Sequence, residues 1–446
     1  MRDLAILLII FGMAWVAWLR PWLGVLVLLV LDTLSPQGFA NGFMQDAPVY
    51  SFMFGVVLLA TAYHFASERS RIDWRGWRWE WVREWRIWVF LLLWLDFLLT
   101  TWYAKDPWAA WPQFVVVSKT LAPVLLTVLL IDTRDKLYAL MLTLALSVAA
   151  AAFKGGYWAV MTGFSDRVYG PPGSPYAGNN EFSVAVLMTL PLLLLFRAQS
   201  AHRGVKLVLA ILIGLSFVAV LSSWSRGALL GLGVVTALLV WHSRRKWLAI
   251  PLLAAGIGLS FVALPETWFG RMESIVQFQG EGSAEGRLKA WRAGWEYVQR
   301  EPLLGSGFEG WRFVNTDPET LHGQDWHSSY VQVLTENGVP GFLLWSALLF
   351  GGIAKLTQLG ARSRLRGDRE AELSAAMLRA GLAGYAVGGA FLGIAYWGLL
   401  YQMLAMAMLL ERFSFASAKA NPSSKANASR GAVDSIAASR RISEQP

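Results

Sequence analysis

Three arginines and one histidine are the residues of this sequence best suited to chemistry: Arg226, Arg287, Arg292 and His327. A guanidinium group is planar and always charged, so it can hold phosphate oxygens through two parallel hydrogen bonds. An imidazole ring accepts a proton near neutral pH and can act as a general base. Residues of these types suit the binding of a diphosphate near a membrane and the removal of a proton from a reacting group.

Each of these residues also has a purely structural interpretation. Arg226 lies where one apolar segment ends and the next begins, and an arginine there can anchor the chain to lipid headgroups instead of binding a substrate. Arg287 and Arg292 lie in a predicted helical stretch over 287–295 and can equally form its solvated face. His327 stands in a loop before a predicted helix, and a lone loop histidine is often structural. Spacing alone leaves both interpretations open.

The sequence predicts neither a metal site nor a cofactor. It contains no cysteine, which excludes disulfides and thiolate metal sites. The outer segments hold no close cluster of histidine and carboxylate residues, since Asp325 beside His327 is too little to bind a metal ion. The glycine-rich run 305–310 resembles a nucleotide-binding fingerprint only loosely, because no predicted strand precedes it.

The composition indicates an integral membrane protein. Of 446 residues, 55% are hydrophobic and only 15% are charged. Apolar runs of about 17–20 residues recur from one end of the chain to the other, as in helices that cross a bilayer. The net charge of +9 comes from Lys and Arg in short connections between these runs, which fits topology signals and argues against nucleic acid as a partner.

We therefore predict an all-α integral membrane protein with about 12–13 transmembrane helices and one large periplasmic loop. Residues 1–200 form the N-terminal helices, and a core over 205–346 includes the loop 265–338. Further transmembrane helices fill 347–413, and a disordered cytoplasmic tail covers 414–446. The expected spans are 4–19, 22–38, 50–66, 86–103, 114–131, 136–153, 181–196, 205–222, 227–242, 246–264, 339–357, 375–392 and 397–412.

The basic connections predict the orientation in the membrane. If the helices alternate, most Lys and Arg residues fall on one side, which we predict to be cytoplasmic. The outer side then receives the turn 222–226 and the loop 265–338, and with them all four candidate residues. The basic connections are 67–86, 132–136, 197–206, 243–246 and 358–372.

Two further features bear on the membrane helices. Trp and Arg alternate over 74–86 at three- and four-residue steps, which predicts an amphipathic helix in the interface or packed on other loops. Asp96 and Lys119 fall inside apolar segments, where charges are costly, and we expect them to pair across adjacent helices.

Several motifs around the predicted loop, taken in order, resemble the O-antigen ligase/polymerase superfamily of bacterial polysaccharide enzymes. The resemblance covers roughly Val205 to Ser346, and the chain departs from it at Ser328, where the superfamily often has asparagine. The matching motifs are Ser223-Trp224-Ser225-Arg226-Gly227-Ala228, Gly286-Arg287-Leu288 followed by Trp291, Glu301-Pro302-Leu303-Leu304-Gly305-Ser306-Gly307, His327-Ser328 and Leu334-Thr335-Glu336-Asn337-Gly338-Val339-Pro340-Gly341.

The N-terminal part is similar to a subgroup of O-glycosylation ligases associated with the exosortase polysaccharide system. The similarity rests on the opening residues 1–4, on 20–24 and on Ser35-Pro36. This chain has Gln37 where the subgroup usually has histidine in an Asn-Pro-His motif.

The resemblance implies a multi-spanning glycosyltransferase of the bacterial inner membrane with its active site facing the periplasm. Such an enzyme moves a glycan from undecaprenyl diphosphate to an acceptor hydroxyl on a glycan, a lipid or a protein. Arg226 and Arg287, with Arg292, would bind the diphosphate and stabilise the charge that develops as it leaves. His327 would take the proton from the acceptor hydroxyl, and neither metal nor nucleotide is needed.

Three other functions compete with a ligase. A polymerase of the same superfamily extends a lipid-linked glycan by the same chemistry, and a protein O-glycosylation ligase uses a protein acceptor. A transporter or flippase belongs to another class, and would be expected to show an internal repeat and ionisable residues along a path. No convincing repeat is found, and the polar residues gather at one predicted membrane face.

Overall fold

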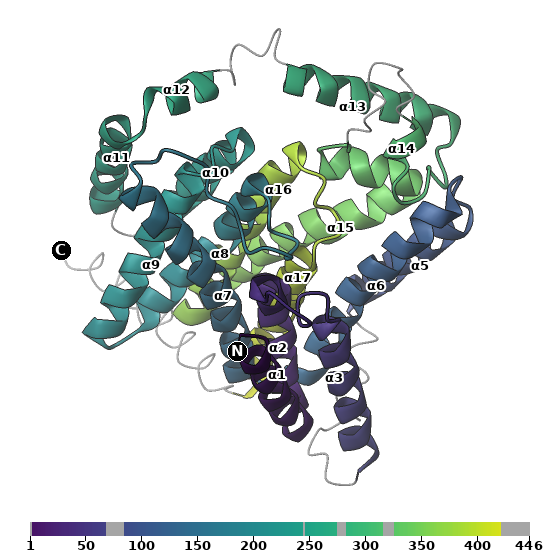
Figure 1. The fold of residues 1–446 in the computed structure, drawn as a ribbon. Helices are drawn as coiled ribbons and strands as arrows, with labels where there is room; N and C mark the ends of the chain where they lie inside the picture. The colour runs from purple at the N-terminus through teal and green to yellow at the C-terminus, as the bar shows by residue number, and fades with distance from the viewer. Residues whose placement is uncertain (1, 68–83, 244–245, 274–281, 315–324, 421–446) are drawn as a thin grey trace, which may run out of the picture.

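A computed structural model of the chain describes residues 2–67, 84–243, 246–273, 282–314 and 325–420. Within these residues every regular element is a helix (Figure 1). The elements are α1 (Arg2–Leu19), α2 (Pro21–Leu34), η1 (Pro36–Phe39), α3 (Val49–Ala66), α5 (Trp85–Trp102), α6 (Pro107–Leu130), α7 (Arg134–Met161), α8 (Asn179–Gln199), α9 (Arg203–Leu221), α10 (Arg226–His242), α11 (Lys246–Ala263), α12 (Glu266–Glu273), α13 (Gly282–Arg300), α14 (Trp311–Val314), α15 (Ser329–Leu365), α16 (Arg369–Gly388), η3 (Gly389–Phe391) and α17 (Gly398–Ala420).

The predicted class, an all-α protein with many membrane spans, is confirmed. Eight of the described helices are long and apolar enough to cross a membrane, namely α1, α3, α5, α6, α7, α8, α9 and α15. The shorter apolar helices α2 and α10 add to these. Together with α11, α16 and α17, these helices overlap all of the spans expected from the sequence, although several ends differ.

Helices α8 and α16 lie at the centre of the bundle, where small residues let them approach closely. α16 carries Gly381, Gly384 and Gly388 at helical spacing. A Cβ added at Gly381 would lie 2.2 Å from the carbonyl oxygen of Met188, and one at Gly388 would lie 2.6 Å from the side chain of Val184. Close backbone approach through small residues is typical of membrane helices, since lipid chains are as apolar as the helix surfaces.

The predicted grouping of connections at two ends of the bundle agrees with contacts between them. At one end Arg134 Nη2 lies 3.0 Å from Asp368 Oδ2, which joins two of the basic connections. At the other end the backbone N–H of Val168 donates to the carbonyl of Ser222 at 2.9 Å. Which end faces the cytoplasm remains a prediction, as does the interfacial helix over 74–86, most of which lies outside the described residues.

The predicted helical stretch over 287–295 lies within α13, and the segment 265–338 also contains α12, α14 and the first turns of α15. Two expectations need correction. Residues 414–420 belong to α17, so the helix continues into what was expected to be a disordered tail. The salt bridges of the described residues do not include Asp96 with Lys119; between these two helices Trp94 Nε1 donates instead to Ser118 Oγ at 3.0 Å.

Candidate active site

His327 stands directly before α15 in a backbone conformation that few side chains adopt. Its φ angle is +45°, in the left-handed region. A non-glycine residue held there costs on the order of 1–3 kcal/mol, so neighbouring contacts must fix it. The next residue, Ser328, is the N-cap of α15 and accepts a hydrogen bond from the N–H of Val331 at 3.5 Å. The histidine therefore sits at the N-terminal end of a long helix.

The residue before the histidine, Trp326, is fully buried and is fixed at three atoms. Its indole N–H donates to Glu336 Oε1 at 3.1 Å. Its carbonyl oxygen accepts from Trp291 Nε1 of α13 at 2.7 Å, and its N–H donates to Asp325 Oδ1 at 2.6 Å. These bonds connect the turn to α13 and to α15, and so they position His327 from both sides.

Glu336 continues this network into the core of the bundle. Tyr396, in the segment before α17, donates to Glu336 Oε2 at 2.7 Å. Asn337 Nδ2 donates to the Tyr396 hydroxyl at 2.7 Å, and its Oδ1 accepts from Thr100 of α5 at 3.0 Å. All four side chains are buried. The Glu-Asn pair of the 334–341 motif is thus a structural connection between α5, α15 and the start of α17.

The motifs at 301–307 and 334–341 are hydrogen-bonded to each other where α15 is broken. Gly338 has φ +63° and ψ −172°, and Pro340 has no N–H to bond the carbonyl of Glu336. The N–H of Gly307 bonds that carbonyl instead at 2.9 Å, and the N–H of Ser306 bonds the carbonyl of Thr335 at 2.8 Å. The glycine-rich run 305–310 therefore supplies backbone donors to the broken helix, which buried backbone groups require.

The network makes a testable prediction for Glu336. In Glu336→Leu the buried donors of Trp326 and Tyr396 lose their acceptor, at a cost of about 1–3 kcal/mol for each unsatisfied group. We expect a lower midpoint of thermal unfolding in detergent and a loss of activity, because Trp326 no longer holds His327. Glu336→Gln keeps one side-chain oxygen as acceptor and is the matched control. Equal stability of the leucine and glutamine variants would contradict this role.

Charges from two other helices act on the imidazole ring of His327. Burial lowers the pKa of His327 below its usual 6.5, and the positive charge of Arg287 lowers it further. The carboxylate of Glu181, in the first turn of α8, acts in the opposite direction. Charges on α13 and at the start of α8 therefore both act on the ring. Burial also raises the pKa of the neighbouring Asp325 carboxyl to about 6.

Arg226 is the first residue of α10, after a tightly bonded turn. Ser225 caps the helix by accepting from the N–H of Ala228 at 3.3 Å. Asn179, at the start of α8, donates through Nδ2 to the carbonyl of Ser223 at 2.7 Å. The beginnings of α8 and α10 therefore lie together, and their positive dipole ends add to the charge of the arginine.

The segment at 391–392 joins Arg226 to the histidine turn. A Cβ added at Gly227, next to Arg226, would lie 3.3 Å from Cβ of Phe391. On the other side Ser329, two residues after His327, donates to the carbonyl of Leu392 at 2.8 Å. Arg226 and His327 thus border the same short segment. Helices α12 and α13 lie along this end of the bundle, at the top of Figure 1.

Arg292 is the predicted site residue that the structure does not place with Arg226, Arg287 and His327. It is exposed on α13, five positions after Arg287, which is a rotation of about 140° round the helix. His322, the other histidine of the segment 265–338, lies outside the described residues. Glu181 was missed by the sequence analysis, because only the tertiary structure brings α8 to the histidine. In the described part of the chain, no group of three or more His, Asp and Glu residues could hold a metal ion.

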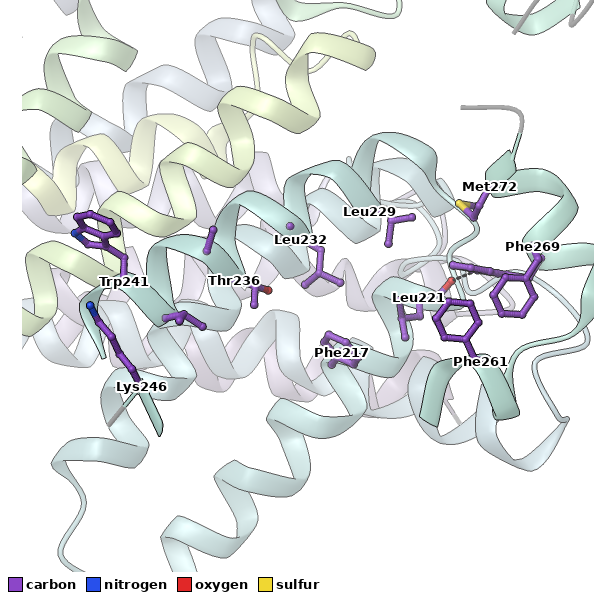
Figure 2. Close-up of a pocket in the computed structure, with 14 residues that line it drawn as sticks. Phe217, Leu221, Leu229, Leu232, Thr236, Trp241, Lys246, Phe261, Phe269 and Met272 are labelled. Carbon is purple, nitrogen blue, oxygen red and sulfur yellow. Dashed lines mark hydrogen bonds between the residues drawn. The ribbon is translucent and has the colours of Figure 1, made fainter. Parts of the chain in front are cut away.

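An apolar groove runs along α10 (Figure 2). Its volume is about 740 Å³, and residues of α9, α10, α11 and α12 form its walls. Leu229 lies near one end with Phe269 and Met272, and Trp241 and Lys246 lie at the other (Figure 2). The 17 residues of α10 measure about 25 Å, close to the hydrocarbon thickness of a bilayer. The shape and lining suit a long apolar chain.

Two segments of the chain match known protein families. Residues 1–201 match a family described as "Family of unknown function (DUF5935)". No curated protein matches the chain. Residues 209–346 match the family described as "O-Antigen ligase", and they contain Arg226, Arg287, Arg292 and His327. The chain therefore contains an O-antigen ligase domain over residues 209–346, which supports its resemblance to the O-antigen ligase superfamily.

Proposed function

We propose that the protein transfers a glycan from undecaprenyl diphosphate to an acceptor hydroxyl on the periplasmic face of the bacterial inner membrane. The proposal is carried by the segment 391–392, which contacts both the start of α10 and the turn of His327, beside an apolar groove along α10. The charge of Arg287 also acts on His327. A ligase or polymerase of the matched family needs cations for a diphosphate, a proton acceptor and room for a lipid chain. These three features lie at one end of the bundle.

The donor fits with its polyprenyl chain in the groove along α10 and its diphosphate near Arg226. The groove walls are apolar from Leu229 to Trp241, so burying a hydrocarbon chain there stabilises the complex by about 25 cal/mol per Å². The diphosphate would then meet Arg226 and the N-terminal end of α10, where peptide dipoles favour an anion. Arg287 would reach it from α13.

The reaction exchanges one C–O bond for another. The acceptor oxygen attacks the anomeric carbon of the donor, and the bond from that carbon to the diphosphate oxygen breaks. The leaving diphosphate keeps the bonding electron pair, and Arg226 and Arg287 stabilise its developing charge. His327, neutral near pH 7 because its pKa is lowered, takes the proton from the acceptor hydroxyl.

Reconstituted protein tests the proposal directly. The protein is placed in liposomes with a glycan linked to undecaprenyl diphosphate and a hydroxyl acceptor, in buffer that contains a chelator. We expect glycan transfer and stoichiometric release of undecaprenyl diphosphate. Flipping of the donor without transfer would instead support a transporter, and activity that is lost in chelator would contradict the metal-free scheme.

The lowered pKa of His327 predicts the pH dependence of transfer. The base works in its neutral form, so the rate should rise as pH increases through the His327 pKa, below 6.5, and then level off. The negative charge of Glu181 raises the pKa of His327, so Glu181→Gln should lower that pKa further. In this variant the transfer rate should therefore rise at a lower pH than in the native protein. Transfer rates from about pH 5 to about pH 8 test this.

Asp325 supplies the control for this profile, because burial places its pKa at about 6. If His327 is the group that titrates, Asp325→Asn should keep a rise with pH, whereas a variant without the imidazole should lose it. A flat profile in Asp325→Asn would assign the titration to the carboxyl and remove the histidine from this role.

A further inference from the structure

A second groove opens on the same end of the bundle, in the part of the chain that matches a family of unknown function. It lies between α2 with η1, the C-terminal end of α7 and the segment 166–172. Its volume is about 680 Å³, close to that of the groove along α10. Leu34, Ala150, Ala151 and Met161 give it apolar walls.

The rim of this second groove carries two cations, the carboxylate of Asp166 and several aromatic rings. Lys154 Nζ lies 5.3 Å from the centre of the Phe39 ring, and Arg167 comes from the segment opposite. The backbone N–H of Arg167 donates to Asp166 Oδ1 at 2.7 Å, which fixes this segment. Tyr157 and Tyr169 are exposed beside the basic side chains. Apolar walls below a rim of cations and aromatic rings suit an amphiphile with an anionic headgroup at a membrane surface.

Each groove has a lining residue that is hydrogen-bonded to residue 221 or 222, where α9 ends and the turn to Arg226 begins. Val168, which lines the second groove, donates its N–H to the carbonyl of Ser222 at 2.9 Å. Trp268, which lines the groove along α10, donates its indole N–H to the carbonyl of Leu221 at 2.9 Å. Residues 221–222 therefore lie between two apolar grooves of similar size. A molecule in each groove would border the turn that leads to Arg226.

We propose that the second groove binds the acceptor, and that this acceptor is a lipid whose anionic headgroup lies between Lys154 and Arg167. The proposal rests on the proposed function for its catalytic meaning, because the first groove then holds the donor. A protein acceptor fits this groove less well: a peptide laid on its apolar walls would lose hydrogen bonds to water and gain few in return. The acceptor glycan would extend from the headgroup toward His327.

Lipid binding can be measured without any transfer reaction. The protein is placed in phosphatidylcholine nanodiscs with a small fraction of phosphatidylglycerol that carries a diazirine on its acyl chain, and labelled peptides are identified by mass spectrometry. We expect labelling of residues 150–161 and 166–172. Reversing both charges, in Lys154→Glu with Arg167→Glu, should lower it by about tenfold. Ala150→Phe, which fills the groove, should lower it similarly.

Matched controls separate a binding site from general contact with lipid. Ala62→Phe on α3 and Arg300→Glu on α13 change exposed residues away from this groove, and labelling should be unchanged in both. The same diazirine on phosphatidylcholine should label this region far less than phosphatidylglycerol does. Equal labelling by the two lipids, or in the charge-reversed variant, would overturn the proposal.

Kinetics then tests whether the bound lipid is the acceptor. With a prenyl-diphosphate-linked monosaccharide as acceptor, the charge-reversed variant should need about tenfold more acceptor for half-maximal rate, with the dependence on donor unchanged. An unchanged acceptor dependence would overturn the acceptor role. Selective lipid labelling in a protein that transfers no glycan would disprove the proposed function and leave the lipid site intact, so the two failures are distinguishable.

Discussion

His327→Ala is expected to lower glycan transfer by about 10²–10⁴-fold, the usual contribution of a general base. The reason is that the acceptor hydroxyl would lose the group that takes its proton, while the donor would keep its arginines and its groove. Binding of undecaprenyl diphosphate should therefore change little. The measurement is transfer by the purified variant in liposomes, together with donor binding by the same preparation.

Two comparisons make this result specific. His64→Ala removes a histidine at the far end of α3, whose Nε2 lies 3.0 Å from the carbonyl of Trp18, and it should leave transfer near the native rate. The remaining activity of His327→Ala should no longer rise with pH. A near-native rate in this variant would show that His327 serves only to shape the turn before α15.

Replacing Arg226 or Arg287, the arginines proposed to bind the diphosphate, is expected to lower glycan transfer by a comparable factor. Arg226→Ala and Arg287→Ala should each lower transfer by about 10²–10³-fold, because each removes a fixed cation from the leaving diphosphate. Arg→Lys should restore little at either position, since an ammonium group cannot form two parallel hydrogen bonds to phosphate oxygens. Transfer rates and membrane insertion are measured for all four variants.

Arg292→Ala is the matched control for these arginines. Arg292 lies on the same helix as Arg287, is exposed and points away from it round the helix axis, so its loss should cost little. Full activity in Arg287→Lys would mean that charge alone is sufficient. Full activity in Arg287→Ala would assign that residue to the solvated face of α13.

The membrane helices could be predicted from the sequence because each is a local feature. An apolar run of sufficient length forms a helix in lipid whatever its neighbours, since every backbone group must be bonded within the segment. All the expected spans, from α1 to α17, are helices. The ends were less predictable: α15 begins at Ser329, ten residues before the expected span, because its first turns are polar and pack against α13.

The candidate residues Arg226, Arg287 and His327 could also be named from the sequence, because their motifs are short and contiguous. The sequence by itself determined which residue types were present, that they fall at one end of the helices, and which superfamily they resemble. It could not determine that Glu181 acts on His327, that Arg292 lies away from the cluster, or that Glu336 is structural. Those facts depend on contacts between elements that are distant in sequence, such as α13 with α15, and no local pattern records them. Only the tertiary structure decided that the glycine-rich run donates hydrogen bonds to the broken helix α15. The physical reason is that the buried carbonyls of Thr335 and Glu336 needed donors that α15 itself could not supply.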